Sequence, residues 1–186
     1  MQTTYATPFA VTIPPDARAH GFYAAPYLAD AFAINLPPDV VACPEQLARY
    51  VFANQPAWVD TLMGVRDTLV AGFGLKTAKQ LAALSAVASE KSDRAEKRIA
   101  IFKIYESNAK EVFLGEDDSH LNFRISVQLR PATAASAPQL VVSTVVHCHN
   151  LLGRCYITVI APFHRQVVQS GLRRAAKLGW PRVAIA

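Results

Sequence analysis

The densest group of ionisable side chains lies at a predicted hairpin turn in the second half of the chain. It consists of Glu116, Asp117, Asp118 and His120, with Arg124 on the strand that follows. Carboxylates beside an imidazole can bind a divalent metal or exchange protons. In the alternative interpretation the turn is structural, because Asp side chains accept hydrogen bonds from nearby backbone N–H groups and pair with an arginine. We favour the structural interpretation, since adjacent aspartates point in different directions in most turns.

Two histidines, His147 and His149, end the last predicted strand. Residues at positions i and i+2 of a strand face the same side, and this arrangement occurs in metal sites. A metal would need a third ligand, for which the candidates are His120, His164 and Asp118. The alternative is that both imidazoles bond to backbone or carboxylate groups at the strand end. We favour this alternative, so the sequence predicts no metal and no other cofactor, and it assigns no catalytic residue.

A third polar group lies on the last predicted helix. Asn150 is expected to cap that helix, and Arg154 follows one turn later. Pro162 lacks the N–H of a helical hydrogen bond, so a kink or a split into two helices is expected there, with His164 and Arg165 just beyond it. These side chains either bind the anionic head group of a mostly apolar ligand, or Arg154 pairs with the acidic turn. We favour the pairing role for Arg154.

Composition and charge exclude several classes of protein. The 186 residues are 52% apolar and 18% charged, which fits one globular domain and excludes a disordered chain. Residues 1–118 carry 11 basic and 14 acidic side chains (−3), whereas residues 119–186 carry 8 basic and 0 acidic ones (+8). The basic residues are dispersed, so we predict pairing within the fold and no nucleic acid partner. The glycines do not cluster into a phosphate-binding loop.

The cysteines and the apolar runs predict a compartment. Cys43, Cys148 and Cys155 form no CxxC pair, and an odd number of cysteines without a signal peptide indicates reduced thiols in a cytoplasmic protein. The longest apolar candidate, residues 151–163, is shorter than the roughly 18–20 residues that cross a bilayer. It also contains Arg154, so we predict no membrane span.

The prolines divide the first part of the chain. Residues 1–26 are predicted to form an extended N-terminal arm, and residues 27–36 a first strand whose apolar face is interrupted by Asp30. Two short amphipathic helices follow. One begins at Pro44, and the other contains Trp58, which we expect in the core.

The remainder is predicted to be a meander of strands followed by a long helix. Residues 75–97 are either helix or mobile loop. Four β-like segments then follow with short turns between them, at 98–106, 110–115, 121–130 and 139–149. From Leu151 to Leu178 apolar residues recur at helical intervals. They are Leu152, Tyr156, Val159, Phe163, Val167 and Leu172, with Tyr156 expected in the core.

This order of elements predicts an α+β fold. A curved antiparallel sheet grips a long C-terminal helix, two short helices follow the first strand, and residues 27–180 form a single domain of this helix-grip type. A curved sheet cannot contact a helix uniformly, so a gap persists between them. Gaps of this kind bind small apolar ligands.

Several motifs resemble the domain of unknown function 2867 family. They are GEDDSHLNFR at 115–124, TVVHCHN at 144–150, Gly153-Arg154 and PFHR at 162–165, with 58–67 and 73–76 also fitting. The resemblance runs from about residue 27 to 176, and Asn122 stands where the family more often has Asp. It implies a cytoplasmic bacterial protein related to the START-like (SRPBCC) helix-grip superfamily, whose members hold hydrophobic ligands between sheet and helix, a few of them being enzymes. Members also occur fused behind NAD(P)-binding reductase-like domains.

We therefore predict a domain that binds a small hydrophobic or amphipathic ligand between sheet and helix. The alternatives are an enzyme that uses a His/Asp cluster near the strand ends, and a partner domain of an NAD(P)-dependent reductase. The sequence leaves the oligomeric state open. The candidate ligand-binding residues are Asp118, His120, Arg124, His147, Asn150, Arg154 and His164.

Overall fold

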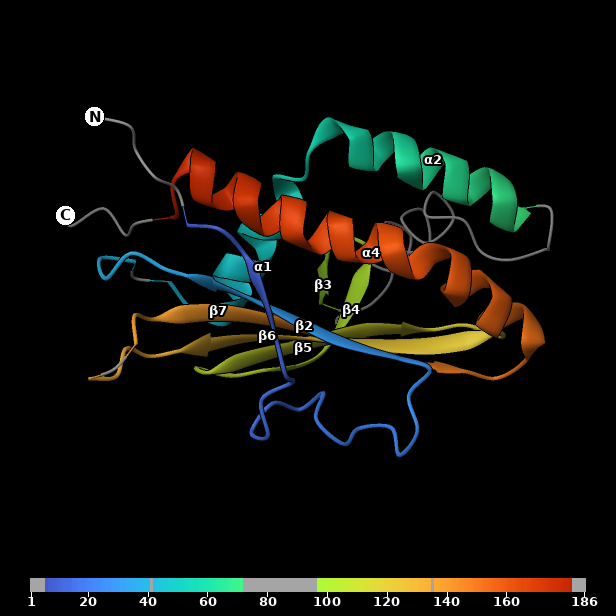
Figure 1. Cartoon of the computed structure of the whole chain (residues 1–186), viewed down its shortest axis with the longest axis horizontal. Helices are drawn as coiled ribbons and strands as arrows, with labels where there is room; N and C mark the ends of the chain where they lie inside the picture. The colour runs from blue at the N-terminus through green and yellow to red at the C-terminus, as the bar shows by residue number, and fades with distance from the viewer. Residues whose placement is uncertain (1–5, 41, 72–96, 135, 182–186) are drawn as a thin grey trace.

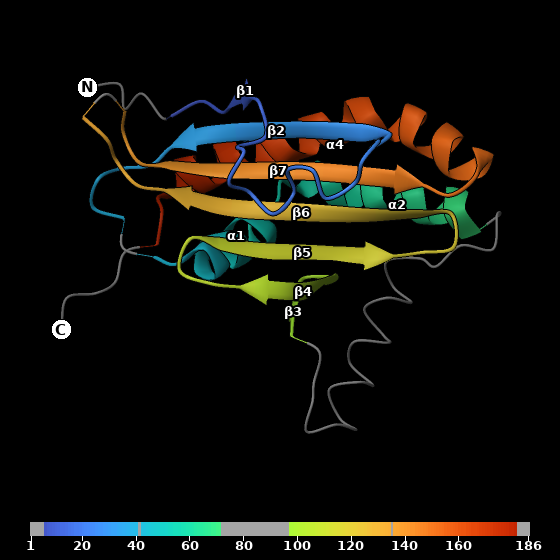
Figure 2. The ribbon, with the colours of Figure 1, turned by 90° about the horizontal axis from the view of Figure 1, so that it is seen from below.

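Seven strands form one antiparallel sheet in the order β1-β2-β7-β6-β5-β4-β3 in the computed structural model, which describes residues 6–40, 42–71, 97–134 and 136–181 (Figure 2). The two longest strands lie beside each other at its centre, paired from Leu121 opposite Cys148 to Arg130 opposite Gln139. The strands are β1 (Phe9–Val11), β2 (Leu28–Asn35), β3 (Arg98–Ile99), β4 (Phe102–Ser107), β5 (Glu111–Asp117), β6 (Leu121–Arg130) and β7 (Gln139–Cys148).

The helices of the described residues lie on one side of this sheet (Figure 1). They are α1 (Pro44–Ala53), α2 (Ala57–Ala71) and α4 (Leu151–Leu178). Helix α4 runs along the face of the sheet, and α2 lies farther from the sheet beside α4 (Figure 1). The predicted α+β fold, with a curved antiparallel sheet that grips a long C-terminal helix, is therefore confirmed.

Local signals explain where α4 begins and ends. The Asn150 side chain caps the helix by accepting a hydrogen bond from the Gly153 N–H at 3.0 Å, as predicted. Gly179 follows the last turn with φ of +86°, a left-handed conformation that favours glycine. Pro162 lies inside one continuous 28-residue helix, so the chain is not split there into two helices.

The buried face of α4 differs from the predicted stripe. Leu172 is fully buried, but Val159 is 60% exposed and Phe163 46% exposed. The most buried residues of α4 are glycines, alanines or their neighbours. The helix approaches the neighbouring elements most closely where its side chains are short. The buried residues are Gly153, Ile157, Gly171, Leu172, Ala175 and Ala176.

Two separate apolar clusters hold the helices on the sheet. The larger packs α1 and the second half of α4 against the strands, and it includes Ile34, Leu47, Leu140 and Leu172. The smaller packs the first turns of α4 around Ile157. The sheet and α4 are therefore fastened at two places along the helix, with a stretch between them where packing is incomplete.

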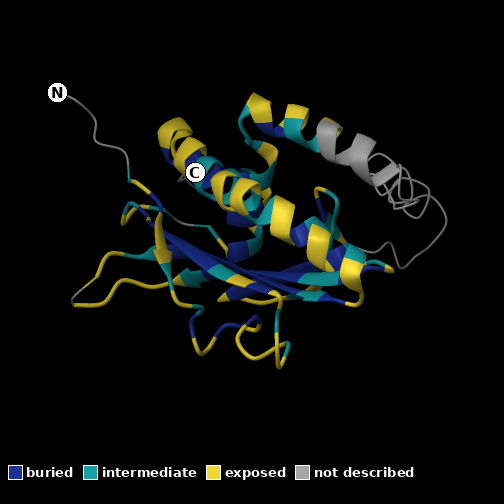
Figure 3. Cartoon of the chain, turned by 45° about the vertical axis from the view of Figure 1, so that its right-hand side comes forward, coloured by how far each residue is buried: buried dark blue, intermediate teal, exposed yellow. Residues whose placement is uncertain are grey.

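The N-terminal segment covers the opposite face of the sheet (Figure 2). Strand β1 pairs with β2, and the residues after it run across β2 and β7 as far as β6 on this face (Figure 2). Apolar residues of this segment pack on Phe113, Val141 and Val145. Its backbone also bonds to the sheet, since the Arg18 N–H donates to Glu111 at 2.9 Å. Both faces of the central strands are consequently buried, as the dark strands in Figure 3 show.

Three expectations from the sequence need comment. The single strand predicted at 98–106 is two strands, β3 and β4, because the chain turns at Ala100, whose φ is +53°. Trp58 is 43% exposed and is not a core residue. The segment predicted as helix or loop at 75–97 lies almost wholly outside the described residues.

No helix in the described part of the chain is long and apolar enough to cross a membrane.

Candidate functional site

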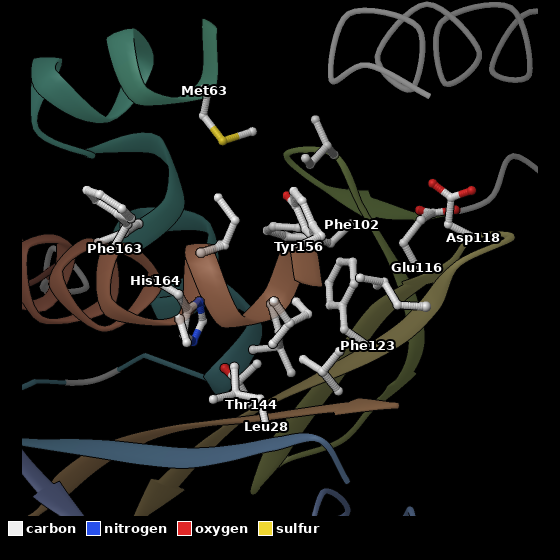
Figure 4. Close-up of a pocket in the computed structure, with 18 of the residues that line it drawn as sticks. Leu28, Met63, Phe102, Glu116, Asp118, Phe123, Thr144, Tyr156, Phe163 and His164 are labelled. Atoms are coloured by element: carbon white, nitrogen blue, oxygen red, sulfur yellow. The ribbon is translucent and has the colours of Figure 1, made fainter. Parts of the chain in front are cut away.

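A cavity of about 240 Å³ lies between the sheet and the middle of α4, where the two apolar clusters leave a gap (Figure 4). Strand residues form its floor and α4 forms one wall (Figure 4). Met63 of α2 lies above it (Figure 4), and Leu62 of α2 also lines it. The apolar lining residues are Leu28, Leu62, Met63, Ile101, Phe102, Leu121, Phe123, Ile125, Val146, Ile157, Ile160, Ala161, Phe163 and Val167.

The apolar floor follows from strand alternation. Phe123 and Ile125 lie two residues apart on β6, so their side chains point to the same face of the sheet. Leu28 and Val146 are directly opposite each other on β2 and β7 and extend the same surface. Tyr156 lines the cavity from α4, half-buried rather than within the core. The site is therefore an apolar chamber into which few polar side chains project.

One polar group lies at the end of β5. Glu116 and Asp118 both line the cavity, and their carboxylates lie on the same side of it (Figure 4). Glu116 is paired with Arg98 at 2.9 Å. Asp118 lies 3.7 Å from Nδ1 of His120, whose side chain is 5% exposed. The His120 ring in turn meets the edge of the Tyr156 ring at a centroid distance of 5.8 Å.

A second polar group lies where β2, β7 and α4 meet. Asp30 and Thr144 are directly opposite each other on β2 and β7. Nε2 of His164 is 3.4 Å from Oδ1 of Asp30, and Nε of Arg165 is 3.5 Å from Oδ2. His164 and Thr144 line the cavity. Of the candidate residues from the sequence, Asp118, His120 and His164 thus lie around one chamber.

Arg124 lies on the opposite face of the sheet. Its guanidinium is 4.2 Å from the centroid of the Tyr105 ring and 5.4 Å from that of Phe22, and it pairs with Asp117 at 2.9 Å. Burial and hydrogen-bond donation to Asp117 raise the pKa of Tyr105 to about 12. The acidic turn therefore divides its side chains: Asp117 faces the N-terminal segment, whereas Asp118 faces the cavity.

His147 also lies away from the cavity. Its ring is 5.5 Å from that of Tyr23 in the N-terminal segment and 5.4 Å from that of His149. His149 bonds to the Asn122 side chain at 2.9 Å. Within the described residues, no group of three or more His, Cys, Asp or Glu side chains is arranged to hold a metal ion.

Asn150 and Arg154 lie at the start of α4, and both are exposed. Asn150 serves as the helix cap. Among the described residues, the ion pairs of the acidic turn join it to Arg98, Arg124 and His120, and none joins it to Arg154. The pairing with Arg154 that the sequence favoured is therefore absent.

Asp30 and Thr144 were not among the candidate residues. A signal for Asp30 was present, since it interrupts the apolar face of the first strand. The sequence held no comparable signal for Thr144, because threonine is common in strands. Its place beside Asp30 depends on the pairing of strands that lie far apart in the sequence.

The chain belongs to the family of proteins of unknown function described as DUF2867, whose model matches residues 22–171. This match confirms the family that the sequence motifs indicated. The chain has no significant match to a curated protein or to a solved structure.

Proposed function

We propose that the protein binds a small hydrophobic or amphipathic molecule in the cavity between the sheet and α4. The observation that carries the proposal is a partly open, mostly apolar pocket of about 240 Å³ between the sheet and α4, bordered by two apolar clusters. Packed protein interiors leave few voids larger than one water molecule. A chamber of this size lacks the dispersion contacts that a filled core has, and an apolar ligand restores them.

The shape of the chamber supports a ligand with an apolar body. Side chains from three sides converge on it: Phe123 and Val146 from the sheet, Ile160 from α4 and Met63 from α2. Methionine is flexible and adapts to ligands of different shape. The polar side chains stand at two separate places, so a ligand can keep its apolar part in the middle.

A cavity-filling variant tests the proposal. Ala161 lines the cavity from α4, and Ala161→Phe places an aromatic ring in the space that the ligand needs. Ala53→Phe, at the exposed end of α1, is the matched control. The probe is 2-methylnaphthalene, and its binding is measured by calorimetry or by fluorescence.

We expect the wild-type protein and Ala53→Phe to bind the probe alike, and Ala161→Phe to bind it at least tenfold more weakly. Equal binding by both variants would place the probe elsewhere on the protein. Native mass spectrometry of protein purified from its own host, followed by organic extraction, then identifies the natural ligand.

A further inference from the structure

The junction of β2, β7 and α4 holds buried polar atoms that an apolar ligand alone does not use. Both carboxylate oxygens of Asp30, Oγ1 of Thr144 and Nε2 of His164 are buried and make no well-formed hydrogen bond among the described residues. The Asp30 carboxylate has only two longer ionic contacts, to Nε2 of His164 at 3.4 Å and to Nε of Arg165 at 3.5 Å. Such atoms cost free energy unless something satisfies them, and buried polar groups in native proteins are nearly always bonded. Their gathering at one wall of the cavity indicates a site.

Asp30 lies behind His164 as seen from the cavity. Nε2 of His164 is 3.4 Å from Oδ1 of Asp30, near but longer than an ordinary hydrogen bond. His164 lines the cavity, whereas Asp30 does not. Hydrogen bonds of this kind are often long in the absence of a ligand and shorten when it binds. The carboxylate is thus placed to orient the imidazole.

The position of Asp30 decides which nitrogen of His164 a ligand meets. A neutral imidazole carries one N–H, and a carboxylate only accepts hydrogen bonds. The proton therefore belongs on Nε2, which faces Asp30. Nδ1, on the other edge of the ring, is then left as the hydrogen-bond acceptor of a residue that lines the cavity.

We propose that His164 is the polar anchor of the cavity and that its Nδ1 accepts a hydrogen bond from a hydroxyl group on an otherwise apolar ligand. Asp30 is a positioning residue that fixes the Nε2–H form of His164. The Thr144 hydroxyl lies opposite Asp30 and completes a polar chain that tightens when the ligand binds. This inference rests on the proposed function and names the class of ligand for it.

The other charges around the cavity favour a hydroxyl over a carboxylate. The lining includes the carboxylates Glu116 and Asp118, and no lysine or arginine is among the described residues that line it. A ligand carboxylate would bring a like charge toward Asp118 and offer Nδ1 no proton. A hydroxyl donates the proton that Nδ1 needs and adds no charge.

A matched pair of probes separates the anchor from the cavity. The probes are 2-naphthol and 2-methylnaphthalene, which differ in a hydroxyl against a methyl group, and 2-naphthoate is the charged comparison. We expect the wild-type protein to bind 2-naphthol about five- to tenfold more tightly than 2-methylnaphthalene, the usual range for one added hydrogen bond. We expect 2-naphthoate to bind at least tenfold more weakly than 2-naphthol.

Substitutions assign the preference to His164. His164→Phe should bind both neutral probes equally, and 2-methylnaphthalene within about twofold of wild type. His149→Phe, on the other face of the sheet, is the control and should keep the preference. Asp30→Asn should reduce the preference, and the imidazole nitrogen shifts of His164 in nuclear magnetic resonance spectra should lose the Nε2–H signature. A purely structural Asp30 would leave those shifts unchanged.

The outcomes distinguish the anchor from the cavity. Suppose that the wild-type protein binds both neutral probes equally, or that His164→Phe still prefers 2-naphthol. Then the proposed role of His164 is wrong, while the proposed ligand-binding function stands. If neither neutral probe binds, both proposals are wrong. Thermal unfolding of each variant verifies that it is folded, and His164→Leu serves as the second test if His164→Phe is not.

Discussion

The first turn of α4 lies directly against the hairpin that carries the acidic turn: a Cβ atom on Gly153 would clash with the backbone carbonyl oxygen of His120. That oxygen accepts a hydrogen bond from the His149 N–H at 2.9 Å, so it is fixed by the end of β7. This contact sets how closely the first turn of α4 approaches the hairpin.

Gly153→Ala should push the start of α4 away from the hairpin. The obstacle is a backbone oxygen held by a hydrogen bond, so we expect a loss of about 1–3 kcal/mol in the free energy of unfolding, the usual cost of overpacking. Gly64→Ala, in α2, is the control, because a Cβ there meets no atom of the described residues within 4 Å. Urea denaturation measures both. Equal stability of the two variants would contradict the close approach.

Leu172→Ala should be more destabilising than Phe163→Ala, although both residues lie on α4. Leu172 is fully buried in the larger cluster, so its truncation should cost about 2–5 kcal/mol. Phe163 is 46% exposed at the edge of the cavity, so we expect a loss below about 1.5 kcal/mol. Denaturant titration of both variants gives the comparison, and the reverse order would show that the helix faces the sheet with a different side.

The three cysteines should react at two different rates. Cys43 and Cys155 are exposed, whereas Cys148 is buried. Burial raises the pKa of the Cys148 thiol, so less of it is thiolate at pH 8, and thiolate is the reactive form. With Ellman's reagent we expect two fast thiols and one much slower thiol in the folded protein, and three fast thiols after denaturation. Cys148→Ala should remove the slow phase alone.

Arg124 should hold the N-terminal segment on the sheet. Its guanidinium lies between Phe22 of that segment and Tyr105 of β4. Arg124→Met should therefore speed tryptic cleavage after Arg18 and lower stability by about 1–3 kcal/mol, while Arg130→Met, exposed at the end of the same strand, changes neither. An unchanged rate of cleavage in Arg124→Met would show that other contacts hold the N-terminal segment on the sheet.

Tyr105 should make the fold less stable at high pH. Its pKa is raised to about 12 in the folded protein, mainly by burial and by the hydrogen bond to Asp117, against about 10 in the unfolded chain. The stabilisation is complete below pH 10 and is lost as the pH rises from 10 to 12. Because the side chain is partly exposed, we expect only about 1 kcal/mol. Tyr105→Phe should not lose this stability as the pH rises. Urea denaturation of both proteins between pH 10 and pH 12 measures the difference.

Much of the fold could be predicted because its signals are local. The alternation of Leu121 to Arg130 defines β6, and Asn150 marks the start of α4. The turn at Ala100 carried no such signal, because alanine rarely adopts a positive φ. The buried face of α4 was predicted only in part: Leu172 is buried and Tyr156 and Val167 line the cavity, whereas Val159 is exposed. The glycines and alanines that approach the neighbouring elements closely add little to a hydrophobic pattern.

The candidate site was less predictable, because it depends on which face of the sheet each residue occupies. The alternation that defines β6 already separates Arg124 from Phe123 and Ile125, so a stricter use of it would have placed Arg124 away from the cavity. The covering N-terminal segment, which makes that second face a buried one, had no periodic pattern. Asp30 and His164 come together only through the packing of α4 on β2.

The most direct test of the ligand-binding cavity is nuclear magnetic resonance of the methyl-labelled protein with 2-methylnaphthalene. The account predicts intermolecular nuclear Overhauser effects from the probe to the methyl groups of Leu28, Val146 and Ile157, which line the cavity. Leu140, fully buried in the larger cluster, should show none. Contacts confined to exposed residues such as Leu151, or no binding at all, would contradict it.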